Sequence, residues 1–112
     1  MTKTMKALRA LALKLPGVEE GVACEGTVLE RRTAKVNGKA FLFLGRGDAL
    51  LKLEGSLVAA TKLGDPRYRV GKGGWVKITF SDDDPPPLAV MKRWIAESHA
   101  LLSDRPPQPK QR

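Results

Sequence analysis

The densest group of chemically useful side chains lies in residues 67–76, which read Arg-Tyr-Arg-Val-Gly-Lys-Gly-Gly-Trp-Val. This stretch combines three cations (Arg67, Arg69 and Lys72), two aromatic rings (Tyr68 and Trp75) and three glycines. Glycine lets backbone N–H groups approach an anion closely, while the cations supply charge and the rings supply flat surfaces. The stretch therefore predicts a turn that grips phosphate, with a tight, well-solvated turn as the alternative.

Side chains suited to catalysis are scarce in the rest of the chain. His99 is the only histidine and Cys24 is the only cysteine, and no spacing in the sequence joins them. An enzyme needs a positioned base or nucleophile. We therefore expect His99 to be a packed or surface residue and the protein not to be an enzyme. A single cysteine forms no intramolecular disulfide, which is typical of a reducing cytoplasm.

Motifs for metals and nucleotides are also missing. Residues 82–84 are three aspartates, but no further ligands follow at the spacing of a calcium loop. One Cys and one His are too few for a zinc site. The glycines at 71 and 73 do not form the Gly-x-x-x-x-Gly-Lys-Ser/Thr loop, and they precede an expected strand rather than a helix. We expect no metal, no cofactor and no nucleotide hydrolysis.

The charge balance favours anionic partners. The chain has 112 residues, with 20 Lys and Arg against 12 Asp and Glu, giving a net charge of +8. Such an excess favours nucleic acid first, although solubility alone is an alternative explanation. The apolar runs are too short for a membrane helix, and Arg9 and Lys14 interrupt the N-terminal run that a signal peptide would need. We expect a cytoplasmic protein that does not associate with membranes.

The length and the 42% hydrophobic content predict one domain with one core, over residues 1–103. Residues 104–112 are rich in Pro, Gln and cations, which predicts a disordered basic tail. Periodicity predicts helices over 2–15, 54–63 and 88–102, and strands over 22–26, 28–36, 39–44, 49–53 and 75–80. Residues 81–84 are expected to cap the last helix. The fold class is therefore α+β: a two-layer sandwich in which N- and C-terminal helices pack on one face of an antiparallel sheet of about five strands.

Asn37-Gly38 predicts a two-residue hairpin turn, which pairs Val36 with Lys39, Ala34 with Phe41 and Arg32 with Phe43. Strand alternation then sorts the side chains onto two faces. The expected core face holds Val28, Ala34, Val36, Phe41, Phe43, Leu51, Leu53, Val76, Ile78 and Phe80. The expected open face holds Arg31, Thr33, Lys35, Lys52, Trp75, Lys77 and Thr79. Arg32 then falls on the core face while Leu42 and Leu44 fall on the open face, so a bulge or a fully buried central strand is required.

Several segments together resemble one protein family. They are Leu-Pro-Gly-Val at 15–18, Val-Asn-Gly-Lys-Ala-Phe-Leu-Phe-Leu at 36–44, Leu-Lys-Leu at 51–53, residues 68–76, and Arg-Trp-Ile and Glu-Ser at 93–95 and 97–98. In this order they resemble the MmcQ/YjbR family over roughly residues 5–102. The resemblance implies a CyaY-like fold, with two terminal helices on an antiparallel sheet. It also implies DNA binding, because members are described as DNA-binding proteins with hairpins proposed as wings.

A CyaY-like fold also raises the question of iron. Frataxin-like proteins bind iron along an acidic first helix and strand. Here residues 2–15 carry four cations and no acid. We therefore expect no iron binding.

Two functions follow as hypotheses. In the first, Lys35, Lys39, Arg67, Arg69 and Lys72 contact phosphates of DNA with little sequence specificity, and Tyr68 or Trp75 stacks on a base or supports the turn. About five neutralised phosphates would give a log–log salt slope of roughly −4 to −5. In the second, the open sheet face is a protein–protein interaction module that binds no nucleic acid. We expect a monomer or a weak homodimer in either case.

Overall fold

A computed structural model describes residues 2–28 and 30–103 of the chain. The predicted tail at 104–112 lies outside the described residues. The elements follow the order α1 (Lys3–Leu13), β1 (Glu19–Ala23), β2 (Arg31–Val36), β3 (Lys39–Leu44), β4 (Asp48–Lys52), α2 (Leu57–Lys62), β5 (Tyr68–Val70), a 3₁₀ turn (Lys72–Gly74), β6 (Trp75–Thr79) and α3 (Leu88–Ser103).

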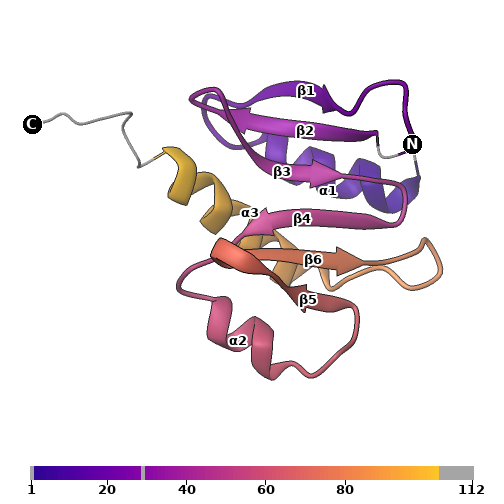
Figure 1. Cartoon of the computed structure of the whole chain (residues 1–112), viewed down its shortest axis with the longest axis vertical. Coiled ribbons are helices and arrows are strands. Elements are labelled where there is room, and N and C mark those ends of the chain that lie inside the picture. The colour runs from indigo at the N-terminus through magenta and orange to yellow at the C-terminus, as the bar shows by residue number, and fades with distance from the viewer. Residues whose placement is uncertain (1, 29, 104–112) are drawn as a thin grey trace, which may run out of the picture.

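The strands form one sheet with the order β1-β2-β3-β4-β6-β5, and every neighbouring pair is antiparallel. Figure 1 shows two layers: the sheet faces the viewer, α1 and α3 lie behind it, and α2 lies beside β5 at one end. The predicted α+β class, with helices on one face of an antiparallel sheet, is confirmed. The described sheet has six strands rather than about five.

The strand absent from the sequence prediction is β5, which has three residues and pairs with β6. Three residues are too few to show an alternating pattern, so β5 is defined only by its ladder with β6. Of the stretch predicted to be a turn leading into the strand at 75, residues 68–70 are therefore strand. The turn proper is confined to residues 71–74.

The first helix is fixed at its N-terminal end by identifiable groups. The hydroxyl of Thr2 accepts a hydrogen bond from the Met5 N–H at 3.2 Å, as an N-cap does. Asp82 reaches the same end from a distant loop and accepts the N–H groups of Lys3 and Thr4 at 3.3 and 3.0 Å. These backbone hydrogen bonds lower the pKa of Asp82. The carboxylate therefore also complements the positive end of the α1 dipole.

The prediction that residues 81–84 cap the last helix is wrong. α3 begins at Leu88, and its first turn is closed by a bond from the Met91 N–H to the Pro87 carbonyl at 3.0 Å. Three consecutive prolines separate the aspartates from this helix, and proline disfavours helical backbone in the residue before it. The aspartate loop instead serves the neighbouring helix α1.

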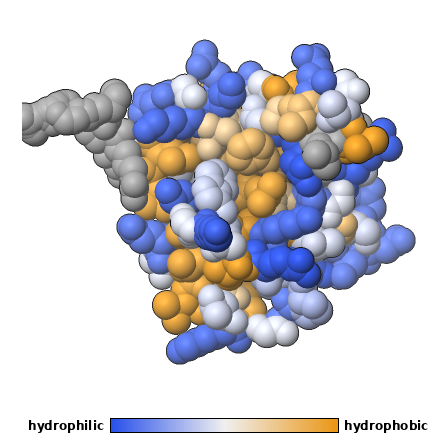
Figure 2. Space-filling model, viewed as in Figure 1, coloured by the Kyte–Doolittle hydropathy of each residue, from blue (hydrophilic) through white to orange (hydrophobic). Residues whose placement is uncertain are grey.

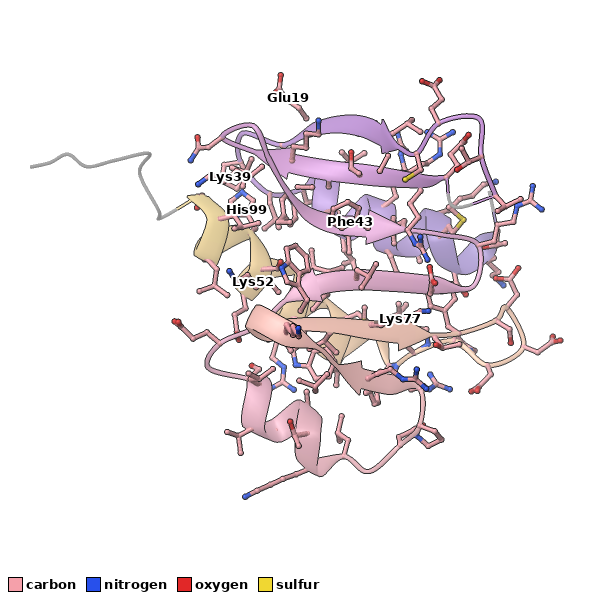
Figure 3. All side chains as sticks on the ribbon, in the orientation of Figure 1. Glu19, Lys39, Phe43, Lys52, Lys77 and His99 are labelled. Carbon is pink, nitrogen blue, oxygen red and sulfur yellow. The ribbon has the colours of Figure 1, made fainter. Side chains whose placement is uncertain are left out.

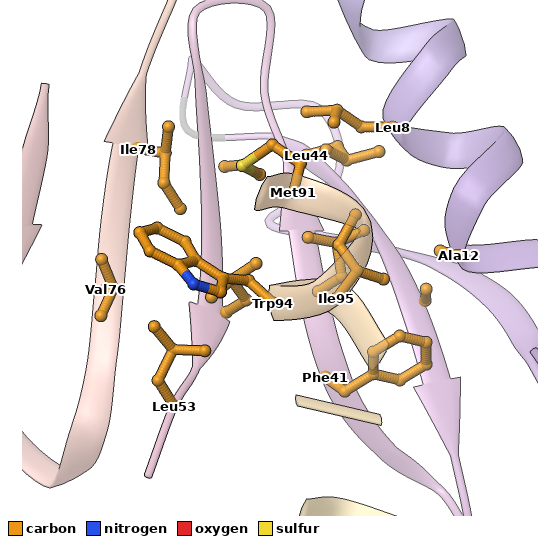
Figure 4. Packing of buried hydrophobic residues seen from close by; sticks show 14 of the residues in the cluster. Leu8, Ala12, Phe41, Leu44, Leu53, Val76, Ile78, Met91, Trp94 and Ile95 are labelled. Atoms are coloured by element: carbon orange, nitrogen blue, oxygen red, sulfur yellow. The ribbon is translucent and has the colours of Figure 1, made fainter. Parts of the chain in front are cut away.

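The core lies between the sheet and the pair α1 and α3. Figure 4 shows Trp94 of α3 lying beside Val76 and Ile78 of β6, while Met91 and Ile95 of the same helix lie closer to α1 on the other side. All five side chains are buried. The spacing of the α3 residues is three and four, so a single stripe of that helix covers the middle of the sheet.

Polar side chains of α3 also fasten the helix to the sheet. The buried hydroxyl of Ser98 donates to the Phe41 carbonyl at 2.6 Å and accepts the Lys52 N–H at 2.9 Å. The Glu97 carboxylate accepts the Ser56 hydroxyl at 2.6 Å and the Glu54 N–H at 2.7 Å. Burial acts to raise the pKa of Glu97, but these hydrogen bonds outweigh it and the pKa is lowered. One turn of α3 thus joins β3, β4 and the loop that follows β4.

A β-bulge in β3 changes which side chains face the helices. Val36 pairs with Lys39 as predicted, but Ala34 pairs with Leu42 and Arg32 with Leu44. Phe41 is the extra residue of the bulge, so both Phe41 and Leu42 are buried. The predicted pairs Ala34–Phe41 and Arg32–Phe43 are wrong for this reason.

The bulge moves three residues to the face opposite to the predicted one. Leu42 and Leu44, predicted to be open, are buried against the helices, and Phe43 lies on the open face. Val28 is also misassigned, because it lies outside β2 and its side chain is fully exposed. The other members of the predicted core face are buried.

Candidate nucleic-acid interface

The sheet face turned away from α1 and α3 is defined by one row of paired residues that crosses all six strands. In an antiparallel ladder, directly paired residues point to the same side. From β1 to β5 the row is Gly21, Thr33, Phe43, Leu50, Lys77 and Arg69. We call the surface built on this row the open face. It is apolar at its centre and basic toward β5.

Trp75 and Phe43 form the apolar centre of the open face. Their ring centroids lie 5.8 Å apart in an edge-to-face arrangement. With Ala23, Cys24, Arg31 and Leu50 they line a shallow hollow of about 360 Å³. Figure 2 shows this centre as an apolar area with hydrophilic side chains around it.

Cations surround this hollow on several strands. Figure 3 shows Phe43 near the middle of the sheet, with Lys52 on β4 to one side and Lys77 on β6 to the other. Lys52 is paired with Trp75, so cation and indole are direct neighbours on one face. Lys35 lies on the same face, because it is two residues after Thr33 in β2 and side chains two residues apart in a strand point to the same side.

One carboxylate, Asp48, organises the charges beside the hollow. Its two oxygens accept hydrogen bonds from Nε and Nη2 of Arg31 at 3.0 and 2.7 Å, and Lys77 Nζ lies 3.6 Å from Oδ2. The hydrogen bonds from Arg31 and the charges of Arg31 and Lys77 together outweigh burial and lower the pKa of Asp48. The same interaction raises the pKa of Arg31. Asp48 therefore stays ionised at neutral pH and neutralises part of the basic face.

The open face keeps a positive excess after this pairing. Within residues 2–28 and 30–103, no carboxylate lies within ion-pair distance of Lys35, Lys52, Arg69 or Lys72. Arg69 is directly opposite Lys77 in the β5–β6 ladder. Like charges placed opposite each other destabilise a sheet. The Asp48 carboxylate, 3.6 Å from Lys77, offsets this repulsion on the Lys77 side, and Arg69 adds to the positive excess.

The predicted site residues fall into three groups: those on the open face or its neighbouring turn, Lys39 on the opposite face, and Arg67 and Tyr68, which have other partners. Lys35, Arg69 and Trp75 lie on the open face, and Lys72 is exposed on the turn between β5 and β6. Lys39 pairs with the buried Val36, so the register places it on the opposite face from Lys35. The structure therefore brings three of the predicted residues to one surface, places Lys72 on the turn before β6, and leaves Lys39 on the other side.

Arg67 and Tyr68 are engaged elsewhere. The Arg67 guanidinium forms ion pairs with Asp84 and, at 3.7 Å, with Asp65, and only 13% of its side chain is exposed. The hydrogen bond with Asp84 raises the pKa of Arg67. Tyr68 is paired with Ile78 on the helix side and meets Trp94 edge to face at a centroid distance of 5.3 Å. Neither is placed to act with Trp75 on one surface.

The glycines of the turn have a backbone role. Gly73 and Gly74 have φ angles of 67° and 85°, a region that favours glycine. A Cβ on Gly74 would approach the Leu53 carbonyl oxygen to 2.4 Å, because the Leu53 N–H donates to the Gly74 carbonyl at 2.9 Å. The glycine-rich sequence thus serves a close contact between two loops, whether or not an anion binds there.

Two open-face residues that matter to the site were missed in the sequence. Phe43 had been assigned to the core, and Asp48 had no assigned role. The predicted register placed the charged Arg32 opposite Phe43 on the core face. That mismatch was the available signal that Phe43 lies on the other face. Nothing in the sequence pairs Asp48 with Arg31, since they meet only once β2, β3 and β4 are assembled.

His99 and Cys24 lie on opposite sides of the sheet. His99 is buried in the helix layer, where its Nε2 lies 2.8 Å from the Pro16 carbonyl oxygen and its ring meets Phe41 edge to face. Cys24 is exposed beside the open-face hollow. Of the two positions predicted for His99, packed or on the surface, the structure shows the packed one. Among the described residues, no group of three His, Cys, Asp or Glu side chains is placed to hold a metal ion.

Comparisons with protein-family profiles, with curated proteins and with solved structures gave no match. The MmcQ/YjbR resemblance therefore stays a prediction from the sequence segments. In the described part of the chain, none of the helices combines the length and apolar character needed to cross a bilayer.

Proposed function

We propose that the protein binds nucleic acid through its open face, using lysines and arginines to contact the phosphate backbone. The observation that carries this proposal is the pair of Arg69 and Lys77, which are directly opposite in the β5–β6 ladder, with a carboxylate at ion-pair distance from Lys77 alone, Asp48 at 3.6 Å. Two like charges side by side cost free energy in the absence of an anion. A phosphate bound between them converts that repulsion into two attractions.

The other cations extend the same surface. Lys52 lies on β4, Lys35 on β2 and Lys72 on the turn that precedes β6. Because neighbouring strands are about 4.8 Å apart, the cations from β5 to β2 span roughly 19 Å. Five phosphate contacts would give a log–log salt slope of roughly −4.5 for duplex and roughly −3.5 for single-stranded nucleic acid.

The contacts favour binding with little sequence specificity. The open face is a sheet surface, and Lys35, Lys52 and Arg69 have no ion-pair partner among the described residues. Phosphate contacts of this kind position a nucleic acid but carry no base information.

The test is fluorescence anisotropy with labelled DNA of about 20 nucleotides, single-stranded and duplex, over a series of salt concentrations. Arg69→Gln with Lys77→Gln removes two charges from the open face. Lys6→Gln with Lys92→Gln removes two exposed charges from α1 and α3, so its net charge matches that of the first variant.

The open-face variant should flatten the slope by about 1.4 to 1.8 and weaken binding, while the helix-layer variant should change neither by much. Equal effects of the two variants would show that only the net charge matters. Absence of binding at low salt would rule out the proposal.

The apolar centre of the open face favours one other candidate, a protein–protein interaction module. Phe43, Leu50 and Trp75 would form the centre of such an interface, with a basic rim. Binding would then depend little on salt. Sedimentation of the protein over a concentration series would detect pairing with a second copy. A monomer at all concentrations would exclude self-association through this surface.

A further inference from the structure

We infer that the hollow beside Trp75 receives unpaired bases, so that the open face prefers single-stranded over duplex nucleic acid. This inference rests on the proposed function, because the phosphates must first be held by the surrounding cations. It adds a second kind of contact, which the phosphate contacts do not require.

The lining of the hollow suits the flat face of a base. Trp75, Phe43 and Leu50 supply apolar surface, and Arg31, whose guanidinium is planar, is also part of the lining. Aromatic rings and arginine planes are the groups on which proteins stack the bases of single strands. Asp48 holds Arg31 through two hydrogen bonds, so the guanidinium is fixed in place before a ligand arrives.

The arrangement of apolar and charged groups matches the two parts of a nucleotide. Lys52 is the ladder partner of Trp75, and Lys77 is the ladder partner of Leu50. Each apolar residue of the hollow on β4 and β6 therefore has a cation next to it on the same face. A base in the hollow would leave its phosphate within reach of these cations, which gives the charge complementarity that a purely apolar partner lacks.

Duplex nucleic acid can make the phosphate contacts of this surface but not the stacking contacts. Its bases are stacked and paired inside the helix, so its phosphates can reach the lysines while the hollow stays empty. A single strand can reach both, because its bases can turn outward. Stacking on an aromatic side chain is sequence-tolerant, which agrees with phosphate contacts that read no sequence.

The chain supplies a reporter for this hollow. Cys24 is the only cysteine of the sequence, and its exposed side chain lies on the border of the hollow. Alkylation of Cys24 by iodoacetamide in the unaltered protein therefore reports whether the hollow is covered. Saturating oligodeoxythymidylate of about 20 nucleotides should slow alkylation several-fold, and a saturating duplex of the same length should not.

A variant separates stacking from charge. Trp75→Leu removes the indole but no cation, so it should weaken binding of the single strand about tenfold and that of the duplex less than about twofold, with unchanged salt slopes. Tyr68→Leu is the matched control, because it removes an aromatic ring from the helix side of the same sheet. It should leave the ratio of single-strand to duplex affinity unchanged.

The outcomes distinguish this inference from the proposed function. Equal affinity for single strand and duplex, with a steep salt slope and no protection of Cys24, would overturn the stacking inference and leave phosphate binding intact. Absence of binding to both would overturn both. Protection of Cys24 that rises with protein concentration without DNA would identify a second copy as the occupant and would also overturn the inference. If Trp75→Leu fails to fold, the alkylation result in the unaltered protein decides alone.

Discussion

Replacement of Asp48 by Asn should make the protein less stable and its binding to DNA tighter. Asp48 bridges Arg31 and Lys77 on the open face, with hydrogen bonds to Arg31 at 2.7 and 3.0 Å. Asparagine keeps the size of the side chain but loses its negative charge. The variant therefore weakens a structural contact and at the same time frees two cations beside the hollow.

The loss of stability follows from the exposure of the pair. Hydrogen bonds to charged groups contribute roughly 1.5–3 kcal/mol. The Arg31 and Asp48 side chains are 23% and 16% exposed, so solvent screens the pair, and the carbonyl oxygen of the introduced amide would still accept one bond. We expect a loss of about 1–2 kcal/mol, which lowers Tm by roughly 5–10 °C in a domain of this size.

The pH dependence of this loss has a definite sign. The pKa of Asp48 is lowered in the folded protein. Its contribution is therefore fully present above the pKa of an unfolded aspartate, about 3.9, and is lost as the pH falls through the lowered folded value. The stability difference between the unaltered protein and Asp48→Asn should be constant near neutral pH and should shrink in acid.

The gain in affinity follows from one additional net positive charge. At about 6 Å from a phosphate in water, that charge contributes roughly 0.7 kcal/mol, or about a threefold gain at low salt. The log–log salt slope should become steeper by about 0.7 to 0.9. Anisotropy titrations with labelled oligonucleotides, read at a temperature where both proteins are folded, measure both quantities.

Glu20→Gln is the control for this prediction. Glu20 also holds an arginine through two bonds, to Arg9 at 2.6 and 2.8 Å, and its replacement changes the net charge equally. It pairs with Ala34, however, and so lies on the helix side of the sheet. Equal increases in affinity and slope for the two variants would refute the assignment of the open face as the binding surface.

Four further substitutions test the packing around the site. Ser98→Ala removes a buried hydroxyl that bonds both a β3 carbonyl and a β4 N–H, and should cost about 1–3 kcal/mol in urea denaturation; no loss would contradict its bridging role. Gly74→Ala should cost more than about 2 kcal/mol, because the new Cβ meets a carbonyl at 2.4 Å, whereas Gly73→Ala, with its nearest neighbour at 3.8 Å, should cost about 1 kcal/mol; equal costs would argue against that contact. Thr33→Val should raise stability by about 1 kcal/mol in thermal unfolding, since the buried Thr33 hydroxyl has no hydrogen-bond partner among the described residues; a decrease would reveal one.

The fold was predictable where local signals act alone. Asn37-Gly38 fixed the pair Val36–Lys39, and the apolar stripes of both long helices were visible as three- and four-residue spacings. The sequence called for a bulge or a fully buried central strand, but it did not locate the bulge at Phe41, whose ring meets that of His99 on a distant helix. A pattern of alternation cannot show where such a residue is inserted.

The candidate site was predictable in its charges and not in its partners. The sequence placed Lys52, Lys77 and Trp75 together, because each follows from strand alternation. It could not show that Arg67 is held by Asp84, which is far along the chain and adjacent only after the loop before α3 is placed. The short strand β5 was not predicted for a similar reason, because it is defined only by its pairing with β6.

The position of α3 in the chain has a consequence for synthesis of the protein. α1 contacts β2 and β3 early, but β4 and the buried side of β6 are covered by residues of Leu88–Ser103, which the ribosome adds after every strand. A nascent chain thus presents Leu51, Val76 and Ile78 without their cover until this helix emerges. Chains grow at about 5–20 residues per second, and exposed apolar strands aggregate readily. A nascent chain whose translation stalls before α3 should therefore remain incompletely folded and bind chaperones.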